Sequence, residues 1–140
     1  MNNQLFYSSS IIGIIIIFVS FYFYSEKLLP LYTITFFGII TSIINHGITN
    51  KSAKNLDRCI MLISAIVYIY YGLEIENKYL QIATLSIIAL MMFTYVSSKF
   101  IKGIIGDSNL SSNIHFITHC ITLFPFCMIV INNYMESKTI

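Results

Sequence analysis

Apolar residues dominate five long stretches of the chain, and short polar segments separate them. A helix needs roughly 20 apolar residues to cross the hydrocarbon core of a bilayer, and each stretch approaches or reaches this length. The pattern predicts an all-α fold, a polytopic bundle of about five transmembrane helices in a single domain over residues 1–140. The predicted helices cover residues 5–24, 28–46, 56–73, 79–98 and 114–131.

Turn-forming residues mark the breaks between these stretches. Pro30 stands in the first turn of the second predicted helix, and Gly103 and Gly106 interrupt the chain before the fifth. The first apolar stretch ends in Phe-Tyr-Phe-Tyr rather than at a small-residue cleavage site. We therefore expect it to be a retained membrane anchor and not a cleaved signal peptide.

Composition also indicates an integral membrane protein. Hydrophobic residues make up 56% of the sequence and charged residues 10%, whereas a soluble domain carries about 25% charged residues. The net charge of +2 is too small and too dispersed to suggest a nucleic-acid partner. The three cysteines all fall in apolar stretches and fit packing rather than a disulfide framework, although Cys59 and Cys120 leave a secondary role at the site below open.

Basic residues in the loops predict the orientation in the membrane. With five crossings, the amino terminus and the second and fourth loops share one side, which carries five basic residues against three on the other. Because basic loops stay in the cytosol, we expect a cytosolic amino terminus, with the endoplasmic reticulum, the Golgi or a host membrane as candidate compartments. The five are Lys51, Lys54, Arg58, Lys99 and Lys102, and the three are Lys27, Lys78 and Lys138.

Five polar residues stand out because ionisable groups inside a membrane are costly. They are Ser42, His46, Asp57, His115 and His119. Ser42 and His46 are spaced four residues apart, as are His115 and His119, so each pair shares a helix face. His46 ends the second predicted helix, Asp57 begins the third, and the other two histidines fall in the first turns of the fifth. The predicted topology places all of these helix ends on the same side.

Three histidines and a carboxylate at one depth suggest a metal centre. Catalytic zinc commonly has three protein ligands and a water whose pKa falls to about 7. We assign His46, His115 and His119 as the zinc ligands. Asp57 is a candidate catalytic residue that accepts a hydrogen bond from the metal-bound water or orients an imidazole. Ser42 could donate to a ligand or to an oxyanion.

Each residue also has an ordinary structural interpretation. A serine in a membrane helix commonly bonds the carbonyl four residues earlier, which applies to Ser42. His46 and Asp57 would be solvated at helix ends, and a His-x-x-x-His pair such as His115 and His119 also arises by chance. The agreement between the spacing and the predicted topology favours the metal site.

Two segments together resemble the CREST superfamily of membrane hydrolases and receptors. They are SIINHGITNKSAKNLDR, residues 42–58, and IHFITHC, residues 114–120. The superfamily includes alkaline ceramidases, adiponectin-type receptors and lipid-remodelling hydrolases of GPI anchors. The resemblance implies that three histidines bind zinc while an aspartate and a serine contact the metal-bound water. The matching residues are, in that order, His46, His115, His119, Asp57 and Ser42.

The chain departs from this superfamily in two ways. Its members usually have seven helices, whereas the pattern here predicts five. The resemblance is therefore to a shortened form, in which fewer helices would enclose a substrate cavity. Alkaline ceramidases also carry an acidic calcium-binding cluster at the amino terminus, and residues 1–24 contain no Asp or Glu. Ceramide itself is therefore not the indicated substrate.

The leading hypothesis is an intramembrane zinc-dependent hydrolase that cleaves an amide or ester bond of a membrane lipid. Two other functions stay open from the sequence. One is a non-catalytic, zinc-bearing receptor or scaffold in which the metal ties helices together. The other is a small accessory membrane protein, of viral origin for example, that binds no metal and whose polar residues only form hydrogen bonds between helices.

Overall fold

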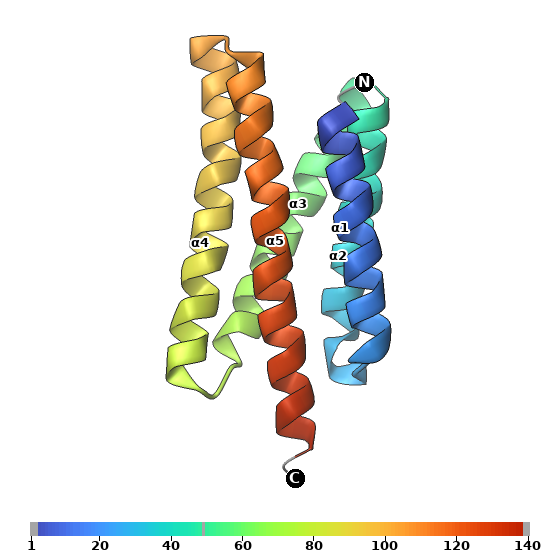
Figure 1. Ribbon diagram of the computed structural model, residues 1–140, viewed down its shortest axis with the longest axis vertical. Helices are drawn as coiled ribbons and strands as arrows, with labels where there is room; N and C mark the ends of the chain where they lie inside the picture. The colour runs from blue at the N-terminus through green and yellow to red at the C-terminus, as the bar shows by residue number, and fades with distance from the viewer. Residues whose placement is uncertain (1–2, 49, 139–140) are drawn as a thin grey trace.

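Five long helices make up the structure, a computed structural model that describes residues 3–48 and 50–138 (Figure 1). The predicted all-α fold and its five membrane-length helices are confirmed. A short 3-10 helix, η1 (Glu26–Leu28), precedes the second long helix, and a π-helical segment, η2 (Ile101–Ile105), extends the fourth. The long helices are α1 (Asn3–Tyr22), α2 (Leu29–Gly47), α3 (Lys51–Leu73), α4 (Lys78–Phe100) and α5 (Ser108–Ser137).

Side-chain caps fix the starts of α3 and α5. The side chain of Asn50 accepts a backbone N–H of α3 at 2.9 Å, and that of Asp107 accepts two from α5 at 3.0 and 2.8 Å. Each cap satisfies donors that the first turn of a helix leaves unpaired. α3 therefore starts at Lys51 rather than at residue 56, and α5 starts at Ser108 rather than at residue 114. The apolar pattern missed these turns because they are polar.

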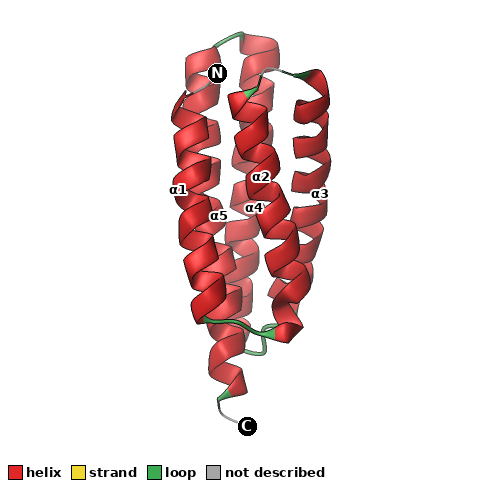
Figure 2. Cartoon of the chain, turned by 90° about the vertical axis from the view of Figure 1, so that its right-hand side faces the viewer, coloured by secondary structure: helices red, strands yellow, loops and turns green. Residues whose placement is uncertain are grey.

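The helices form a ring in chain order (Figures 1 and 2). Each packs on the next, from α1 to α5, and α5 closes the ring against α1. Because successive helices run in opposite directions, the start of α1 and the α2–α3 and α4–α5 connections lie at one end of the bundle, at the top of Figure 1. The predicted placement of these segments on one side is confirmed, while their cytosolic orientation stays a prediction.

Large apolar side chains cover the outside of the ring. Phe21 of α1 is 82% exposed, Ile66 of α3 is 68% exposed and Phe93 of α4 is 69% exposed. In water such a surface would be unfavourable, because folding normally removes apolar area from solvent. All five helices are long and apolar enough to cross a bilayer. The chain therefore has the exterior and the helix lengths of a multi-pass membrane protein.

The interior of the ring has an apolar half and a polar half. Leu31, Tyr68 and Phe126 are at most 2% exposed and lie in the half nearer the α1–α2 and α3–α4 connections. The opposite half contains buried polar side chains from every helix: Ser8, Ser9, Ser42, His46, Asp57, Ser98, Ser111 and His115. Buried polar groups are costly unless they are hydrogen-bonded, so this polar half is where a functional site is expected.

Candidate metal site

Three histidines meet in the polar half of the bundle. His46 comes from the last turn of α2, and His115 and His119 come from one face of α5. One ring nitrogen of each lies within 4.8 Å of those of the other two. The ring of His46 lies 5.3 Å from that of His115 and 5.5 Å from that of His119, measured between centroids. The three side chains are therefore close enough to bind one metal ion.

His46 carries an unpaired ring nitrogen. Its Nε2 atom is buried and has no hydrogen-bond partner among the described residues. Burying such a group without a partner costs about 1–3 kcal/mol. A neutral imidazole nitrogen is also the commonest protein ligand for a metal. A metal ion held by the three histidines would remove this cost.

Two serines of α1 orient His119. The Oγ atoms of Ser8 and Ser9 lie 3.2 and 3.1 Å from Nδ1 of His119, and both hydroxyls donate to the carbonyl of Leu5, at 3.0 and 2.8 Å. A hydroxyl has only one hydrogen, so toward the imidazole both serines act as acceptors. Nδ1 of His119 then carries the proton, and its Nε2 lone pair is left available to a metal.

Ser98 of α4 orients His115 in the same way. Its hydroxyl donates to the carbonyl of Tyr95 at 2.8 Å and lies 3.5 Å from Nδ1 of His115. Ser111 of α5 in turn donates to the carbonyl of Ser98 at 2.8 Å, which ties the two helices together at this level. Metal-binding histidines commonly donate their second ring N–H to a neighbouring acceptor, which fixes the tautomer and the orientation of the ring.

The donor set fits a metal that prefers nitrogen ligands. Three neutral imidazoles suit zinc, copper, iron or nickel better than calcium or magnesium, which prefer oxygen. Neither cysteine considered from the sequence joins the cluster: Cys59 is exposed on the outer surface, and Cys120, although half-buried, is not among the three grouped residues. The ligand set in the described part of the chain thus consists of His46, His115 and His119.

Asp57 lies on the α2 side of the site. Its Oδ2 accepts a hydrogen bond from Asn45 Nδ2 at 2.7 Å, and its Oδ1 accepts a longer one of 3.5 Å from Thr41 Oγ1, whose single hydrogen is shared with the carbonyl of Gly38 at 3.2 Å. The side chain of Asp57 is 3% exposed. Because α3 begins early, Asp57 stands in its second turn rather than at its start. Likewise His115 lies about two turns inside α5 and not in its first turns. All of these residues still lie in the same half of the bundle.

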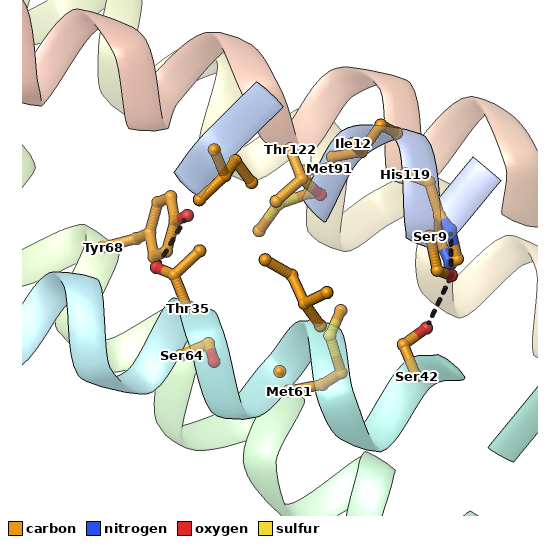
Figure 3. Close-up of a pocket in the computed structure, with 13 residues that line it drawn as sticks. Ser9, Ile12, Thr35, Ser42, Met61, Ser64, Tyr68, Met91, His119 and Thr122 are labelled. Carbon is orange, nitrogen blue, oxygen red and sulfur yellow. Dashed lines mark hydrogen bonds between the residues drawn. The ribbon is translucent and has the colours of Figure 1, made fainter. Parts of the chain in front are cut away.

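Ser42 reaches the cluster indirectly. Its Oγ lies 3.1 Å from Oγ of Ser9, which is itself bonded to His119 (Figure 3). Since the hydrogen of Ser9 goes to Leu5, Ser42 is the donor in this pair. The sequence suggested that Ser42 could donate to a ligand, and the structure instead links it to His119 through one intervening hydroxyl.

Two cavities adjoin the histidines. We call the first the basic cavity: it has a volume of about 560 Å³, and its walls include His46, His115 and Asp57. The second, the apolar pocket, has a volume of about 70 Å³ and runs between the helices from Ser9, Ser42 and His119 to Thr35 and Tyr68 (Figure 3). The histidine cluster therefore lies between a polar space and an apolar one. The basic cavity takes its name from Lys51, Lys54, Arg58, Lys99 and Lys102 in its walls.

Sequence reasoning missed the serines that hold the histidines. Ser8, Ser9 and Ser10 form a polar triplet within an otherwise apolar helix. This triplet could have indicated that the helix contributes polar contacts to the site. Only the packing of α1 against α5 shows that two of the three face His119. Ser98 gave no such signal, because it lies at the polar end of its apolar stretch.

Comparisons with protein-family models, with curated proteins and with solved structures gave no match to this chain. The resemblance to the CREST superfamily therefore stays a prediction that rests on the two sequence segments.

Proposed function

We propose that this protein is an intramembrane zinc-dependent hydrolase that cleaves an amide or ester bond of a lipid. One observation carries the proposal: three histidines converge, with a buried and unpartnered Nε2 on His46, at the junction of a polar cavity and an apolar pocket. Hydrolysis of a lipid needs water and an acyl chain at the same place. The resemblance to the CREST superfamily points to the same chemistry.

The ion would be held by His46, His115 and His119. Bound zinc makes hydroxide available near neutral pH and polarises a carbonyl group. The serine contacts described above support this role, because an acceptor at Nδ1 of His115 and of His119 favours the tautomer whose Nε2 lone pair is available to a metal.

Asp57 is the proposed general base. It lines the same cavity as His46 and His115, and the bonds from Asn45 and Thr41 hold its carboxylate in one orientation. A positioned carboxylate can take a proton from the attacking water and return it to the leaving group. Ser42 would keep Ser9, and through it His119, in place.

The apolar pocket, with a volume of about 70 Å³, would take the part of the acyl chain next to the carbonyl, and the rest of the chain would extend between the helices. The walls of the pocket are largely apolar, with Ile12, Ile39 and Met91 from three different helices, and the pocket ends next to His119. A chain entering between helices would bring its carbonyl carbon toward the histidines. This arrangement favours a lipid over a small soluble amide or ester.

Metal content of the detergent-purified protein, measured by elemental mass spectrometry, tests the proposal. We expect one zinc ion per chain in the wild type, its loss in a His115→Ala/His119→Ala variant and its retention in a Cys120→Ala control. Wild-type protein that binds zinc is then screened for hydrolysis of ceramides, acylglycerols and phospholipids. A folded wild-type protein without zinc would overturn the proposal.

A structural metal site is the second candidate. The ligands come from α2 and α5, which are not neighbours in the ring, so an ion between them would brace the bundle across its interior. In this case a chelator lowers the melting temperature, and the screen finds no hydrolysis of any lipid. Hydrolysis that is lost with the chelator and restored by zinc would rule this candidate out.

A further inference from the structure

The walls of the basic cavity carry a strong positive charge. Lys51, Lys54 and Arg58 come from the first turns of α3, and Lys99 and Lys102 come from the end of α4 and from η2. The only acidic residue in the walls, Asp57, is already bonded to Asn45 and Thr41. The five cations therefore face the cavity with a single carboxylate among them.

The five basic residues do not form a continuous cluster in the sequence. The two basic groups are separated by more than half of α3 and almost all of α4, and only the ring of helices brings them to one cavity. Three basic residues alone would serve mainly to set the topology. Five fall within the range of about 4–8 that recognises an anionic lipid headgroup.

Lys99 reaches into the cavity from its wall. Its ammonium group lies 4.8 Å from the ring centroid of Tyr95, and that ring lies 5.7 Å from the ring of His115. Lys99 is also partly buried, unlike the exposed Lys51, Lys54 and Lys102. A cation held over an aromatic ring is restricted in position, so Lys99 places one positive charge at a fixed depth close to the histidines.

The basic cavity is large enough to bind a small molecule, and the apolar pocket lies next to it. The volume of the basic cavity, about 560 Å³, falls within the range of about 300–1,000 Å³ that is usual for small-molecule sites. His46 and His115 line this cavity, while His119 lines the apolar pocket. A molecule that fills both spaces must therefore have an anionic end and an apolar end, with the histidines between them.

We propose that the basic cavity binds the phosphate-bearing headgroup of an anionic membrane lipid, whose acyl chain enters the apolar pocket with the part next to the headgroup. The binding site follows from the cavity itself. That this lipid is also the substrate rests on the proposed function. The bond next to the histidines would then be the one that joins the acyl chain to the headgroup portion.

A soluble phosphate compound is the competing ligand of the same chemistry. It could pair with Lys99 and Lys102 but would leave the apolar pocket without an occupant. A phosphate group pairs with lysine side chains through charge-assisted hydrogen bonds, but only an amphiphile also has an apolar part that can enter the apolar pocket. The structure therefore favours the lipid headgroup as the source of the phosphate.

Binding to the full-length purified protein, measured by native mass spectrometry, tests the inference. The ligands are phosphatidic acid, diacylglycerol with the same acyl chains, and glycerol 3-phosphate. We expect phosphatidic acid to bind at least tenfold more tightly than either of the other two. Equal binding of phosphatidic acid and diacylglycerol would overturn the proposal, and so would glycerol 3-phosphate binding as tightly as phosphatidic acid.

Charge-removal variants locate the site. Lys99→Gln/Lys102→Gln removes two of the five cations and is expected to weaken phosphatidic acid binding roughly thirtyfold. Lys99→Arg/Lys102→Arg should restore most of this affinity. The matched control Lys27→Gln/Lys78→Gln removes two lysines from the opposite end of the bundle and should leave binding unchanged. If both glutamine pairs weakened binding equally, the basic cavity would not be the headgroup site.

Turnover separates this inference from the proposed function. If the protein binds phosphatidic acid through Lys99 and Lys102 but hydrolyses no lipid, the headgroup site stands and the hydrolase proposal falls. If it hydrolyses diacylglycerol as fast as phosphatidic acid, and Lys99→Gln/Lys102→Gln leaves both rates unchanged, the hydrolase stands and the headgroup site falls.

Discussion

Ser9 of α1 and His119 of α5 are joined by a contact of 3.1 Å between Oγ and Nδ1, and Ser8 makes a second contact of 3.2 Å to the same nitrogen. The first and last helices of the chain thus meet at a candidate metal ligand. Since both hydroxyls donate to the carbonyl of Leu5, they fix the proton of His119 on Nδ1. The first helix therefore determines which nitrogen of this candidate ligand carries the proton.

Removal of these two hydroxyls should weaken metal binding. In Ser8→Ala/Ser9→Ala, His119 loses both acceptors of its Nδ1 proton, so its ring can turn and change tautomer. Loss of such supporting groups typically lowers metal affinity by about 10- to 100-fold. We expect a decrease of this size in zinc affinity, measured by competition with a chromophoric chelator.

Ser10→Ala is the matched control for this experiment. Ser10 lies next to Ser9, and its hydroxyl bonds to the carbonyl of Phe6 in its own helix. Its removal should leave zinc affinity unchanged. If Ser8→Ala/Ser9→Ala and Ser10→Ala had the same zinc affinity, the serines would not orient a metal ligand.

Asp57→Asn should separate catalysis from metal binding. The substitution keeps the shape of the side chain, and thus an oxygen for Asn45 or Thr41, but removes the charge and the ability to accept a proton. We expect the zinc content to stay at the wild-type level while lipid turnover falls by about 10²- to 10⁴-fold, the usual contribution of a positioned general base. Turnover at the wild-type rate would refute the proposed role.

A purely structural role for Asp57 makes a different prediction. The carboxylate joins α3 to α2 through its bond of 2.7 Å to Asn45, and Asn45→Ala removes that bond while keeping the charge. If Asp57 only holds the helices together, Asn45→Ala should lower the melting temperature and turnover more than Asp57→Asn, which keeps an oxygen for Asn45. If it is the general base, Asn45→Ala should retain far more activity than Asp57→Asn at similar stability.

The fold could be predicted because each membrane-spanning helix corresponds to a long apolar stretch of the sequence. Every backbone group must be satisfied within the bilayer, so long apolar stretches have almost no alternative to helix. The starts of α3 and α5 were wrong by about a turn or more because Asn50 and Asp107 cap polar first turns that extend beyond the apolar stretches. Apolar length therefore identified the helices, while the capping residues determined their true ends.

The histidines could be predicted, and most of their neighbours could not. The spacing of His115 and His119 and the number of crossings placed three rings at one end of the bundle, and the structure brings them together. Which face of each helix points inward depends on how the helices rotate against one another. α1 has nearly uniform hydrophobicity around its axis, so the inward position of Ser9 became visible only once α1 was packed against α2 and α5.

Gly13→Ala should destabilise the bundle where α1 and α2 touch. A Cβ atom at Gly13 would lie 2.6 Å from Cγ2 of Ile39, a branched side chain that cannot easily move away. Overpacking of this kind costs about 1–3 kcal/mol, more than the gain of up to about 1 kcal/mol in helix propensity. We expect a lower melting temperature in detergent, measured by circular dichroism.

Gly38→Ala on the facing helix is the control for this substitution. A Cβ there would make ordinary contacts, at 3.7 Å to Ser64 and 3.8 Å to Ile60. The melting temperature should therefore stay the same or rise. In addition, Ile39→Ala should relieve the defect of Gly13→Ala, because it removes the clashing group. A rise in melting temperature for Gly13→Ala alone would show that α1 and α2 are farther apart than the structure has them.

Ser64→Phe should shorten the lipids that the protein accepts. Ser64 lines the apolar pocket, and its hydroxyl donates to the carbonyl of Ile60 in its own helix, at 2.8 Å. A phenyl group there would fill the space proposed for the acyl chain, and zinc content should not change because Ser64 is not a candidate ligand. We expect turnover of a long-chain lipid to fall roughly tenfold or more relative to a short-chain analogue, while Ser64→Ala preserves both rates. Equal losses for the two lipids would mean that the chain lies elsewhere.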